Sequence, residues 1–254
     1  MPEFLRYELG AFTRCDRPVV REAVVTLLVN GRSLGSMMVT PDRLEDFALG
    51  FLWLEGFITE ARDVMEVGVE GDEVRVTAHN ATLPVDFQVR TTGLHEGDAL
   101  RASTPGAALT VEAGVTPEQV FDFVRALNAN AGQYRQSGGV HTTALICADG
   151  TLVVAEDVGR HNTVDKLVGE CLRRGLPMAG GTLVASGRLT VEFVHKAARM
   201  GVPVLISRTS PTDLALAAAT ALGLTLIGYA RGGAFNLYTH HERVNGQTPE
   251  GEPS

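Results

Sequence analysis

Short apolar runs alternate with amphipathic helical patterns throughout the second half of the chain. Each run has the length of a buried strand and is followed by polar residues. Between the runs, apolar residues recur at three- and four-residue spacings, as on one face of an α-helix. This alternation predicts βαβ units with right-handed crossovers and a mostly parallel sheet. The predicted strands are residues 151–155, 182–185, 204–207 and 225–229.

Capping residues predict where two of the helices begin. Asn162, with Asp165 three residues later, predicts a helix start after the first of these strands. Ser210, Pro211 and Asp213 predict another start, because proline is favoured at the first helical position. Both starts place polar side chains directly after a strand.

The first half of the chain has an antiparallel character. Residues 23–29 and 32–39 flank Asn30-Gly31, which is a strong signal for a two-residue hairpin turn. Thr40 can cap the helix that follows, with Pro41 at its first position.

Further elements are expected between this region and the second half. Residues 64–69 and 73–78 predict a second hairpin, and residues 85–91 predict one more strand. Residues 93–114 have weak periodicity and are interpreted as a loop or linker. Residues 118–130 have the apolar spacing of a connecting helix.

Two domains follow from these patterns. The first is a smaller N-terminal α+β domain that includes the linker loop, residues 1–114, and the second is an α/β domain, residues 115–254. With 254 residues and 44% hydrophobic composition, the chain can bury one large core or two small ones.

Composition and charge exclude several classes of protein. A net charge of −8 without a basic stripe argues against a nucleic-acid partner. No run reaches the roughly 18 apolar residues of a membrane span, and the first residues lack the layout of a signal peptide. Three separated cysteines cannot form a disulfide framework. We therefore expect a cytoplasmic protein with no membrane partner.

Several common cofactor and metal motifs are absent from the sequence. There is no Cys-x-x-Cys pair, so a bound zinc is not expected. There is also no phosphate-binding loop of the Walker type and no Gly-x-Gly-x-x-Gly opening a helix.

Basic and small polar residues gather at the ends of the predicted strands. Because the carboxyl ends of parallel strands open on one side of a sheet, these residues are expected to line one crevice. Free N–H groups at helix starts and arginine side chains both favour anions, so the crevice is expected to bind a polyphosphate-like ligand. The residues are Arg160, His161, Ser186, Arg188, Arg208 and Arg231.

The motifs at these positions resemble those of the FdhD family of formate dehydrogenase accessory sulfurtransferases. The resemblance extends over roughly residues 17–241 and its motifs occur in the family's order. They are Asn30-Gly31, Glu45-Asp46-Phe47-Ala48-Leu49-Gly50-Phe51-Leu52, Gly138-Gly139-Val140-His141, Glu156-Asp157-Val158-Gly159-Arg160-His161-Asn162-Thr163-Val164-Asp165-Lys166, Ser186-Gly187-Arg188, Ser210-Pro211-Thr212 and Tyr229-Ala230-Arg231-Gly232-Gly233.

The resemblance implies a fold, a cargo and partners. The fold would be a cytidine-deaminase-like α/β domain without the deaminase zinc. The cargo would be the molybdenum bis(molybdopterin guanine dinucleotide) cofactor, with GDP as an analogue. Family members take sulfur from a cysteine desulfurase and pass it to this cofactor before it enters formate dehydrogenase. A homodimer is compatible with the resemblance.

The resemblance also implies which residues would bind the cofactor. Phosphate contacts are expected from Arg160, Arg188 and Arg231, and the remaining residues would shape the pocket or orient the ligand. These are Gly139, His141, Asp157, His161, Asn162, Ser186, Gly187, Tyr229, Ala230, Gly232, Gly233, Ala234 and Asn236.

One departure from the family pattern bears on the chemistry. The family carries sulfur on a Cys-Gly-x-Cys loop, whereas Pro105 and Ala108 stand at the matching positions here, and neither can form a thiolate. Cys147 and Cys171 fit apolar core positions, and Cys15 is the most exposed candidate thiol. Two hypotheses remain: a sulfurtransferase that uses another cysteine, and a cofactor-binding chaperone that carries no sulfur.

Overall fold

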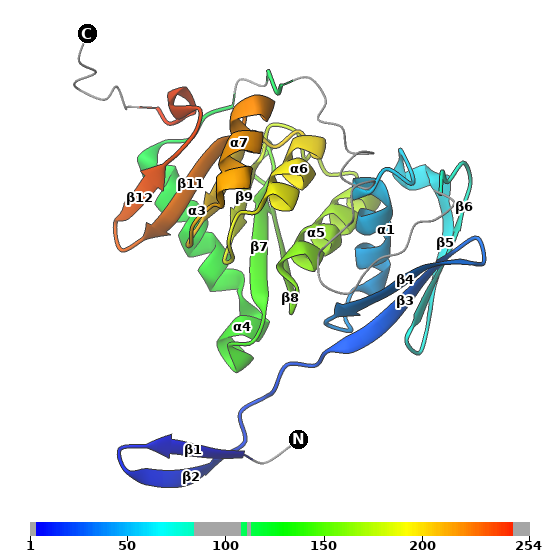
Figure 1. Cartoon of the computed structure of the whole chain (residues 1–254), viewed down its shortest axis with the longest axis horizontal. Coiled ribbons are helices and arrows are strands. Elements are labelled where there is room, and N and C mark those ends of the chain that lie inside the picture. Colours follow the sequence, from blue (N-terminus) through cyan, green and yellow to red (C-terminus); the bar gives the residue numbers. More distant parts are fainter. Residues whose placement is uncertain (1–3, 84–107, 111–112, 246–254) are drawn as a thin grey trace.

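The computed structural model describes residues 4–83, 108–110 and 113–245. They form a six-stranded sheet flanked by helices, a four-stranded sheet with one helix, and a separate two-stranded hairpin (Figure 1). The predicted strand at 85–91 and most of the predicted loop at 93–114 lie outside the described residues.

The six-stranded sheet has the order β12-β11-β10-β9-β7-β8. Its central strands β9, β10 and β11 are parallel, whereas β7 lies antiparallel between β9 and β8, and β12 is antiparallel to β11. The bounds are β7 (His141–Ile146), β8 (Leu152–Asp157), β9 (Thr182–Ala185), β10 (Val204–Ser207), β11 (Thr225–Arg231) and β12 (Ala234–Leu237).

The mostly parallel sheet predicted from the sequence is therefore a mixed sheet. The tight turn at Asp149-Gly150 joins β7 to β8, and a connection this short can join only antiparallel strands. Since β7 runs against both of its neighbours, β8 runs in the same direction as β9, β10 and β11. The four predicted strands still end at one edge of the sheet. The deaminase-like description of this fold remains a prediction.

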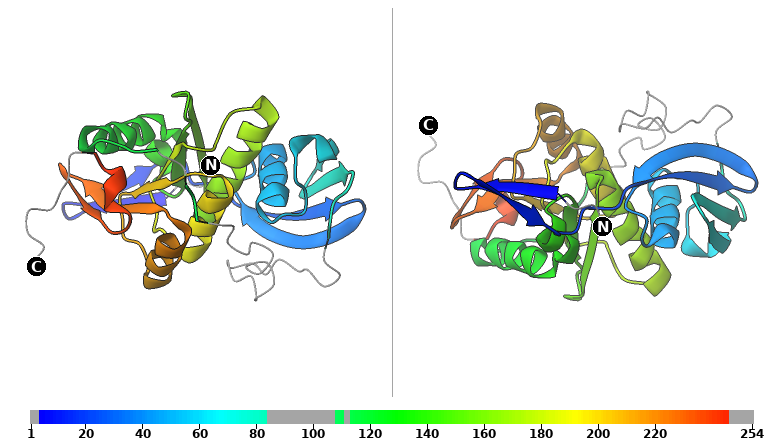
Figure 2. Two further views of the ribbon diagram at one scale, coloured as in Figure 1. Left: turned by 90° about the horizontal axis from the view of Figure 1, so that it is seen from above. Right: turned by 90° about the horizontal axis from the view of Figure 1, so that it is seen from below.

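Helices cover both faces of the six-stranded sheet (Figures 1 and 2). On one face, α3 (Pro117–Asn130) packs through Val120, Val124 and Leu127. On the other, α5 (Arg160–Arg174), α6 (Val191–Arg199) and α7 (Asp213–Leu222) enclose the largest apolar core. A short helix, α4 (Gly132–Ser137), leads from α3 into β7.

The four-stranded sheet confirms both predicted hairpins. Its order is β4-β3-β6-β5, and β3 and β6 pair in parallel at its centre. The helix α1 covers one face and forms a separate core with it. The bounds are β3 (Ala23–Val29), β4 (Arg32–Val39), α1 (Leu44–Leu54), β5 (Val64–Glu70) and β6 (Glu73–Ala78).

The two sheets meet where α1 crosses α5 at very short range. A Cβ atom added to Gly50 would lie 1.8 Å from the carbonyl oxygen of Asp165. A Cβ atom added to Gly169 would lie 1.8 Å from the carbonyl oxygen of Asp46. The glycines therefore allow the two helix backbones to touch. The boundary predicted between the domains at residues 114 and 115 remains a prediction.

The predicted start of α1 is wrong by a few residues. The helix begins at Leu44, after Arg43 in a left-handed conformation (φ 51°). Thr40 does not cap it, because its hydroxyl accepts a hydrogen bond from the Val158 backbone N–H, 3.0 Å away. Arg43 instead donates to the carbonyl oxygen of Val154 on β8 (2.9 Å).

The other two predicted helix starts are also wrong. α5 begins at Arg160 and is capped by Gly159, while Asn162 lies within the first turn. α7 begins at Asp213, and Thr212 rather than Ser210 is its cap, with the Thr212 hydroxyl accepting from the Ala215 N–H. α5 ends at Gly175, which lies in the left-handed region (φ 64°).

The sequence patterns did not predict the N-terminal hairpin. Strands β1 (Phe4–Glu8) and β2 (Ala11–Cys15) pair with each other, and among the described residues with no other strand. Figure 1 shows the hairpin below the body, joined to it by an extended segment. Its strands lack an apolar alternation that would have matched a core.

Candidate functional site

The ends of β8, β9, β10 and β11 form one connected edge. Backbone hydrogen bonds join the loops: the Leu189 N–H donates to the Ser210 carbonyl (3.2 Å), and the Tyr229 N–H donates to the Thr209 carbonyl (3.0 Å). The basic residues predicted for a crevice therefore come from adjacent loops on one side of the sheet. We call this the arginine edge: the carboxyl end of β11 and the segments that follow β8, β9, β10 and β11, residues 158–161, 186–190, 208–212 and 229–233.

His141, Arg160 and Gly187 lie together at one end of the arginine edge. A Cβ atom added to Gly187 would lie 3.1 Å from His141 Nδ1 and 3.6 Å from Arg160 Cβ. Burial and the guanidinium of Arg160 lower the pKa of His141, although Asp157 acts in the opposite direction. Burial and the positive charge of Arg160 therefore both disfavour the imidazolium form of His141.

Arg160 is the first residue of α5 and has unsatisfied hydrogen-bonding capacity. Its Nε atom is buried and has no hydrogen-bond partner among the described residues. Burial and the nearby guanidinium of Arg188 both lower the pKa of Arg160, while Glu192 raises it. Two arginines close together at a helix start, one with a buried unpartnered N–H, favour an anion between them.

His161 and Glu192 lie next to each other beside these arginines. The His161 Nε2 atom lies 3.4 Å from a Glu192 carboxylate oxygen, and the His161 ring lies 6.3 Å from the ring of Phe193. Glu192 is in the first turn of α6 and was missed in the sequence analysis. Acidic residues are common in the first turn of helices, so Glu192 alone does not indicate a binding site in the sequence.

The side chains of Asp157 and Asn162 stabilise the turn from β8 into α5 through hydrogen bonds within the protein. The Asp157 carboxylate is fully buried and accepts from the N–H groups of Thr40 (3.0 Å) and Gly159 (2.8 Å). The Asn162 amide donates to the same carboxylate (2.8 Å) and to the Met38 carbonyl oxygen (2.8 Å). These bonds fix the turn from β8 into α5, and therefore the position of Arg160.

Ser186 and Gly187 are fixed by neighbouring strands. The Thr142 N–H donates to the Ser186 hydroxyl (2.9 Å), and the Ser186 N–H donates to the Thr142 carbonyl (2.9 Å). The buried hydroxyl of Ser207 donates to the Gly187 carbonyl (2.7 Å). Arg188 follows with an exposed side chain, so it can reach a ligand at the edge.

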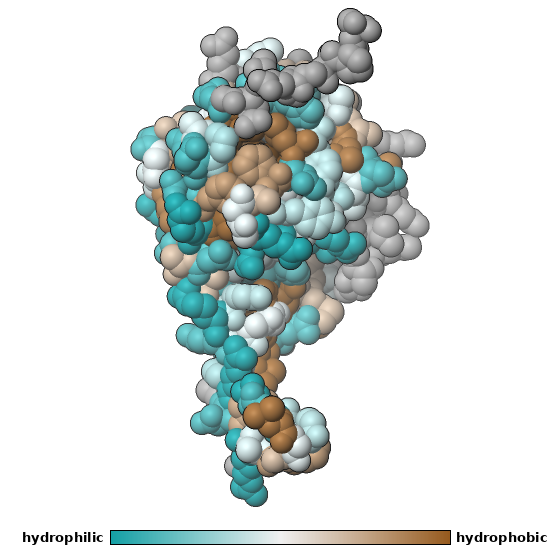
Figure 3. All heavy atoms as spheres, turned by 90° about the vertical axis from the view of Figure 1, so that its left-hand side faces the viewer, coloured by the Kyte–Doolittle hydropathy of each residue, from teal (hydrophilic) through white to brown (hydrophobic). Residues whose placement is uncertain are grey.

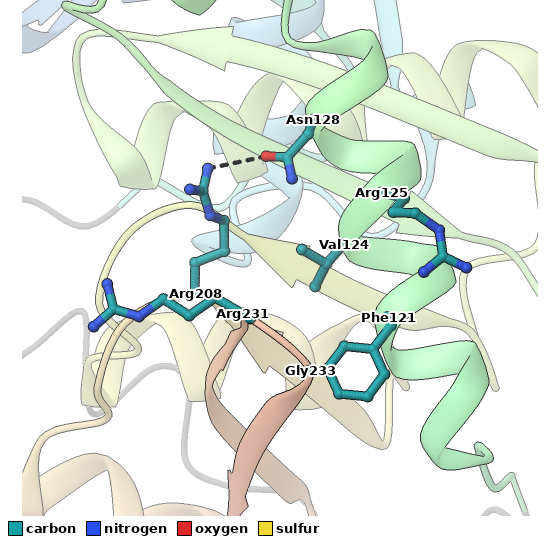
Figure 4. Close-up of a pocket in the computed structure, with 8 residues that line it drawn as sticks. Phe121, Val124, Arg125, Asn128, Arg208, Arg231 and Gly233 are labelled. Carbon is teal, nitrogen blue, oxygen red and sulfur yellow. Dashed lines mark hydrogen bonds between the residues drawn. The ribbon is translucent and has the colours of Figure 1, made fainter.

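A pocket of about 490 Å³ lies at the opposite end of the arginine edge, between α3 and the turn from β11 to β12 (Figure 4). Figure 4 shows Arg208 reaching back to α3, where it donates to the Asn128 side-chain oxygen (2.9 Å), while Arg231 points away from that helix. The lining residues are Phe121, Val124, Arg125, Asn128, Arg208, Arg231, Gly232 and Gly233.

The α3 side of this pocket was missed by the sequence analysis. Phe121 and Val124 contribute to the apolar spacing that predicts a connecting helix at residues 118–130, and Val124 is buried. Phe121 is half-buried and its ring lies 5.7 Å from the ring of Phe235 on β12. Only the sheet order, which places α3 across from the β11–β12 turn, reveals that Phe121 borders the pocket.

Tyr229 has a strained backbone at the edge. Its φ of 53° is unusual for a bulky residue, and its side chain is 40% exposed. The Arg231 guanidinium lies 5.8 Å from the centre of the Tyr229 ring. Strain of this kind is common at binding sites, so the pair is well suited to contact a ligand.

The remaining predicted residues are near the edge but differ in exposure. Ala230 is fully buried, whereas Ala234 and Asn236 are exposed on β12, where the Asn236 amide donates to the Tyr238 hydroxyl (3.3 Å). A Cβ atom added to Gly139 would lie 2.7 Å from the Val20 side chain, so Gly139 serves packing. Ligand binding by any of these residues remains a prediction.

The three cysteines differ in accessibility. Cys147 and Cys171 are buried, and burial raises the pKa of both thiols, that of Cys171 to about 12. Cys15 is half-buried at the base of the N-terminal hairpin. Since the thiolate is the sulfur nucleophile and must reach its partner, Cys15 is the most accessible candidate among the three cysteines.

The described residues contain neither a cluster of metal ligands nor a membrane-spanning helix. No group of three or more His, Cys, Asp or Glu side chains is arranged to hold a metal ion. No helix in the part of the chain that the structure describes is long and apolar enough to cross a membrane.

The sequence and the fold both match known proteins over nearly the whole chain. Residues 20–245 match the FdhD/NarQ family. The sulfur carrier protein FdhD of Shouchella clausii is 34% identical over 252 residues, covering 94% of each chain. That of Bacillus subtilis is 32% identical over 252 residues, covering 94% of this chain and 95% of the relative.

A solved structure also matches this chain over nearly its whole length. The crystal structure of a protein from Desulfotalea psychrophila, provisionally described as a formate dehydrogenase accessory protein, superposes with a TM-score of 0.79. It is 31% identical and the match covers 96% of this chain and 98% of that one. The chain therefore belongs to the FdhD/NarQ family of sulfur carrier proteins.

Proposed function

We propose that this chain is an accessory protein for formate dehydrogenase maturation that binds the molybdenum bis(molybdopterin guanine dinucleotide) cofactor at the arginine edge. The observation that carries the proposal is Arg160, whose buried Nε has no hydrogen-bond partner among the described residues. A buried, unpartnered guanidinium nitrogen is costly, and a phosphate oxygen at this position would satisfy it.

The charges around Arg160 support a polyphosphate ligand. Arg188 is close enough to lower the pKa of Arg160 by repulsion, so the free protein holds two guanidinium groups against each other. An anion between them relieves this repulsion and gains charge-assisted hydrogen bonds to both. The pyrophosphate of a guanine dinucleotide, or that of GDP, provides such a charge.

The pocket at the other end of the edge suits a planar group. Phe121 and Val124 give it an apolar wall, and Arg208 and Arg231 give it donors. A guanine or pterin ring packs against an aromatic face and accepts hydrogen bonds from arginine. We therefore assign phosphate binding to Arg160 and Arg188, and ring binding to the pocket.

For the transfer of sulfur, we assign the carrier role to Cys15. Its thiolate would attack the outer sulfur of the persulfide on a cysteine desulfurase, which breaks the S–S bond. The desulfurase cysteine leaves as a thiol, and Cys15 becomes the persulfide that supplies the cofactor, before delivery to formate dehydrogenase. The alternative is a chaperone that holds the cofactor without carrying sulfur, which the burial of Cys147 and Cys171 favours.

A GDP titration by calorimetry tests the binding proposal. Arg160→Ala should weaken GDP binding at least tenfold, because it removes one charge-assisted contact worth about 1.5–3 kcal/mol. Arg62→Ala is the matched control, since Arg62 has a side chain 82% exposed on the four-stranded sheet unit, and it should leave the affinity unchanged. Equal affinities of wild type and Arg160→Ala would overturn the proposal.

A further inference from the structure

One carboxylate lies among the basic groups of the arginine edge. Glu192 is in the first turn of α6, just after Arg188 in the chain, and its side chain is 16% exposed. One of its oxygens lies 3.4 Å from His161 Nε2, and its charge raises the pKa of the neighbouring Arg160. A negative charge in this position weakens the attraction of the two arginines for any phosphate. A site that only had to hold phosphate tightly would not contain it.

The buried ion pair behind Glu192 does not need this carboxylate. The second Glu192 oxygen lies 3.8 Å from the ammonium of Lys196, which is beyond hydrogen-bond distance. The same ammonium donates to the Asp165 carboxylate at 2.7 Å, and both of these side chains are buried. Lys196 therefore has its own partner on α5, and Glu192 is left to act on the arginine edge.

Two donors beside Glu192 have no partner among the described residues. They are the buried Nε of Arg160, at the start of α5, and the buried hydroxyl of Thr190, at the start of α6. Thr190 is the N-cap of α6, yet its side chain makes no capping hydrogen bond. Both groups can donate to a phosphate oxygen. Since Thr190 precedes Glu192 by two residues, a phosphate bound there lies within strong Coulomb range of the Glu192 carboxylate.

Phosphates of two kinds respond differently to such a neighbour. A terminal phosphate has a second pKa of about 6, so it carries close to two negative charges at pH 8. A phosphate that is esterified on both sides carries one. The pyrophosphate of a guanine dinucleotide is esterified at both ends, whereas GDP ends in a free phosphate. Repulsion by a nearby carboxylate therefore acts more strongly on GDP than on the dinucleotide.

We infer that Glu192 is a specificity-determining residue, which selects a pyrophosphate esterified at both ends over nucleotides that end in a free phosphate. The inference rests on the proposed function, because that function places the pyrophosphate between Arg160 and Arg188. A repulsive group is a general means of rejecting a competitor that shares most contacts with the correct ligand. Two unit charges about 4 Å apart in water change an equilibrium about fivefold, so one carboxylate gives a measurable selection.

Calorimetric titrations at pH 8 with GDP and with its β-methyl ester test this selection. The ester has the same nucleoside and one negative charge fewer. Wild type should bind the ester at least as tightly as GDP, whereas a purely cationic site would favour GDP. Glu192→Gln should gain about fivefold more affinity for GDP than for the ester. A merely structural role of Glu192 would change both affinities by the same factor.

Two further variants serve as controls. Glu192→Asp keeps the charge and should keep the preference of the wild type. Glu45→Gln removes the same charge from the first turn of α1 and should leave the preference unchanged. Glu45 acts on Arg173 near the far end of α5, roughly 20 Å along that helix from Arg160.

The outcomes separate this inference from the proposed function. An equal change for both ligands in Glu192→Gln, or a wild type that binds GDP more tightly than the ester, overturns the selection by Glu192 and leaves the proposed function intact. The wild-type comparison decides the matter by itself should Glu192→Gln fail to fold. No binding of either ligand by the wild type overturns both.

Discussion

The ammonium group of Lys166 lies 2.8 Å from the carboxylate of Asp157, and both side chains are fully buried. The same ammonium donates to the Thr40 carbonyl (2.9 Å) and to the Asp42 carboxylate (2.5 Å). Asp157 also holds the turn into α5. The ion pair therefore ties the loop before α1 to the loop that positions Arg160.

Replacing one member of this pair should strongly destabilise the fold. Lys166→Met leaves Asp157 buried without its cation, which costs about 3–5 kcal/mol. The free energy of unfolding in urea measures the loss. Arg75→Met is the control, because Arg75 pairs with Glu73 on an exposed surface, and such pairs contribute about 1 kcal/mol or less. A loss for Lys166→Met no larger than that of the control would contradict this role.

The crossing of α1 and α5 predicts a steric effect of a single methyl group. Gly169→Ala places a Cβ atom 1.8 Å from the Asp46 carbonyl oxygen, so the helices must separate at a cost of about 3 kcal/mol or more. Thermal unfolding should show a clear drop in Tm. Gly68→Ala on β5 meets no atom within 4 Å and has no left-handed φ, so its Tm should stay near that of the wild type. Equal values of Tm for the two variants would exclude the close crossing.

The environment of His141 predicts how nucleotide binding depends on pH. Burial and Arg160 lower the pKa of His141 from its ordinary value of 6.5 in the free protein. The unfolded chain therefore binds more protons, and the free protein loses stability as the pH falls below about 6.5. A bound phosphate acts in the opposite direction and favours the imidazolium. GDP affinity should rise as the pH falls from 8 to 6.

His141→Gln isolates this contribution, because the ligand titrates identically with both proteins. The difference in log Kd between wild type and variant should grow toward low pH in a series of calorimetric titrations. A difference that stays constant from pH 8 to 6 would show that His141 does not respond to the ligand.

Accessibility predicts which cysteine reacts. Iodoacetamide should label Cys15 in the native protein, whereas Cys147 and Cys171 should react only after unfolding, because burial raises the pKa of their thiols. Peptide mapping by mass spectrometry measures both. Native labelling of Cys171 at the rate of Cys15 would contradict the buried environment.

The same mapping separates the carrier from the chaperone. After incubation with a cysteine desulfurase and cysteine, a persulfide on Cys15 that disappears in Cys15→Ser supports the carrier. Absence of a persulfide in a protein that binds GDP supports the chaperone.

Strands β8 to β11 and the two hairpins of the four-stranded sheet were predicted from the sequence because local patterns determine them. The apolar runs that became β8 to β11 are each bounded by glycine or polar residues, and the turn at Asn30-Gly31 fixed the first hairpin. Helix starts were less predictable, since Thr40 meets the backbone of Val158, more than a hundred residues away. No local pattern encodes such a contact.

The arginine edge was predicted because its residues follow local apolar patterns in the sequence. The pocket was missed because its lining depends on how distant elements pack. Arg160 and Arg188 come shortly after apolar runs, so the sequence alone predicts that they lie at the ends of strands. Phe121 lies on a helix whose position over the sheet depends on strand order. The hairpin of β1 and β2 was missed because, among the residues that the structure describes, it packs against no core, and Figure 3 shows brown apolar side chains exposed on it.

Hydrogen exchange of the amide protons, measured by mass spectrometry with and without GDP, tests the location of the site most directly. Peptides that cover residues 158–161, 186–190, 208–212 and 229–233 should exchange more slowly with GDP bound, while β5 and β6 should not change. Protection confined to the four-stranded sheet, or no protection at saturating GDP, would contradict the arginine edge as the nucleotide site.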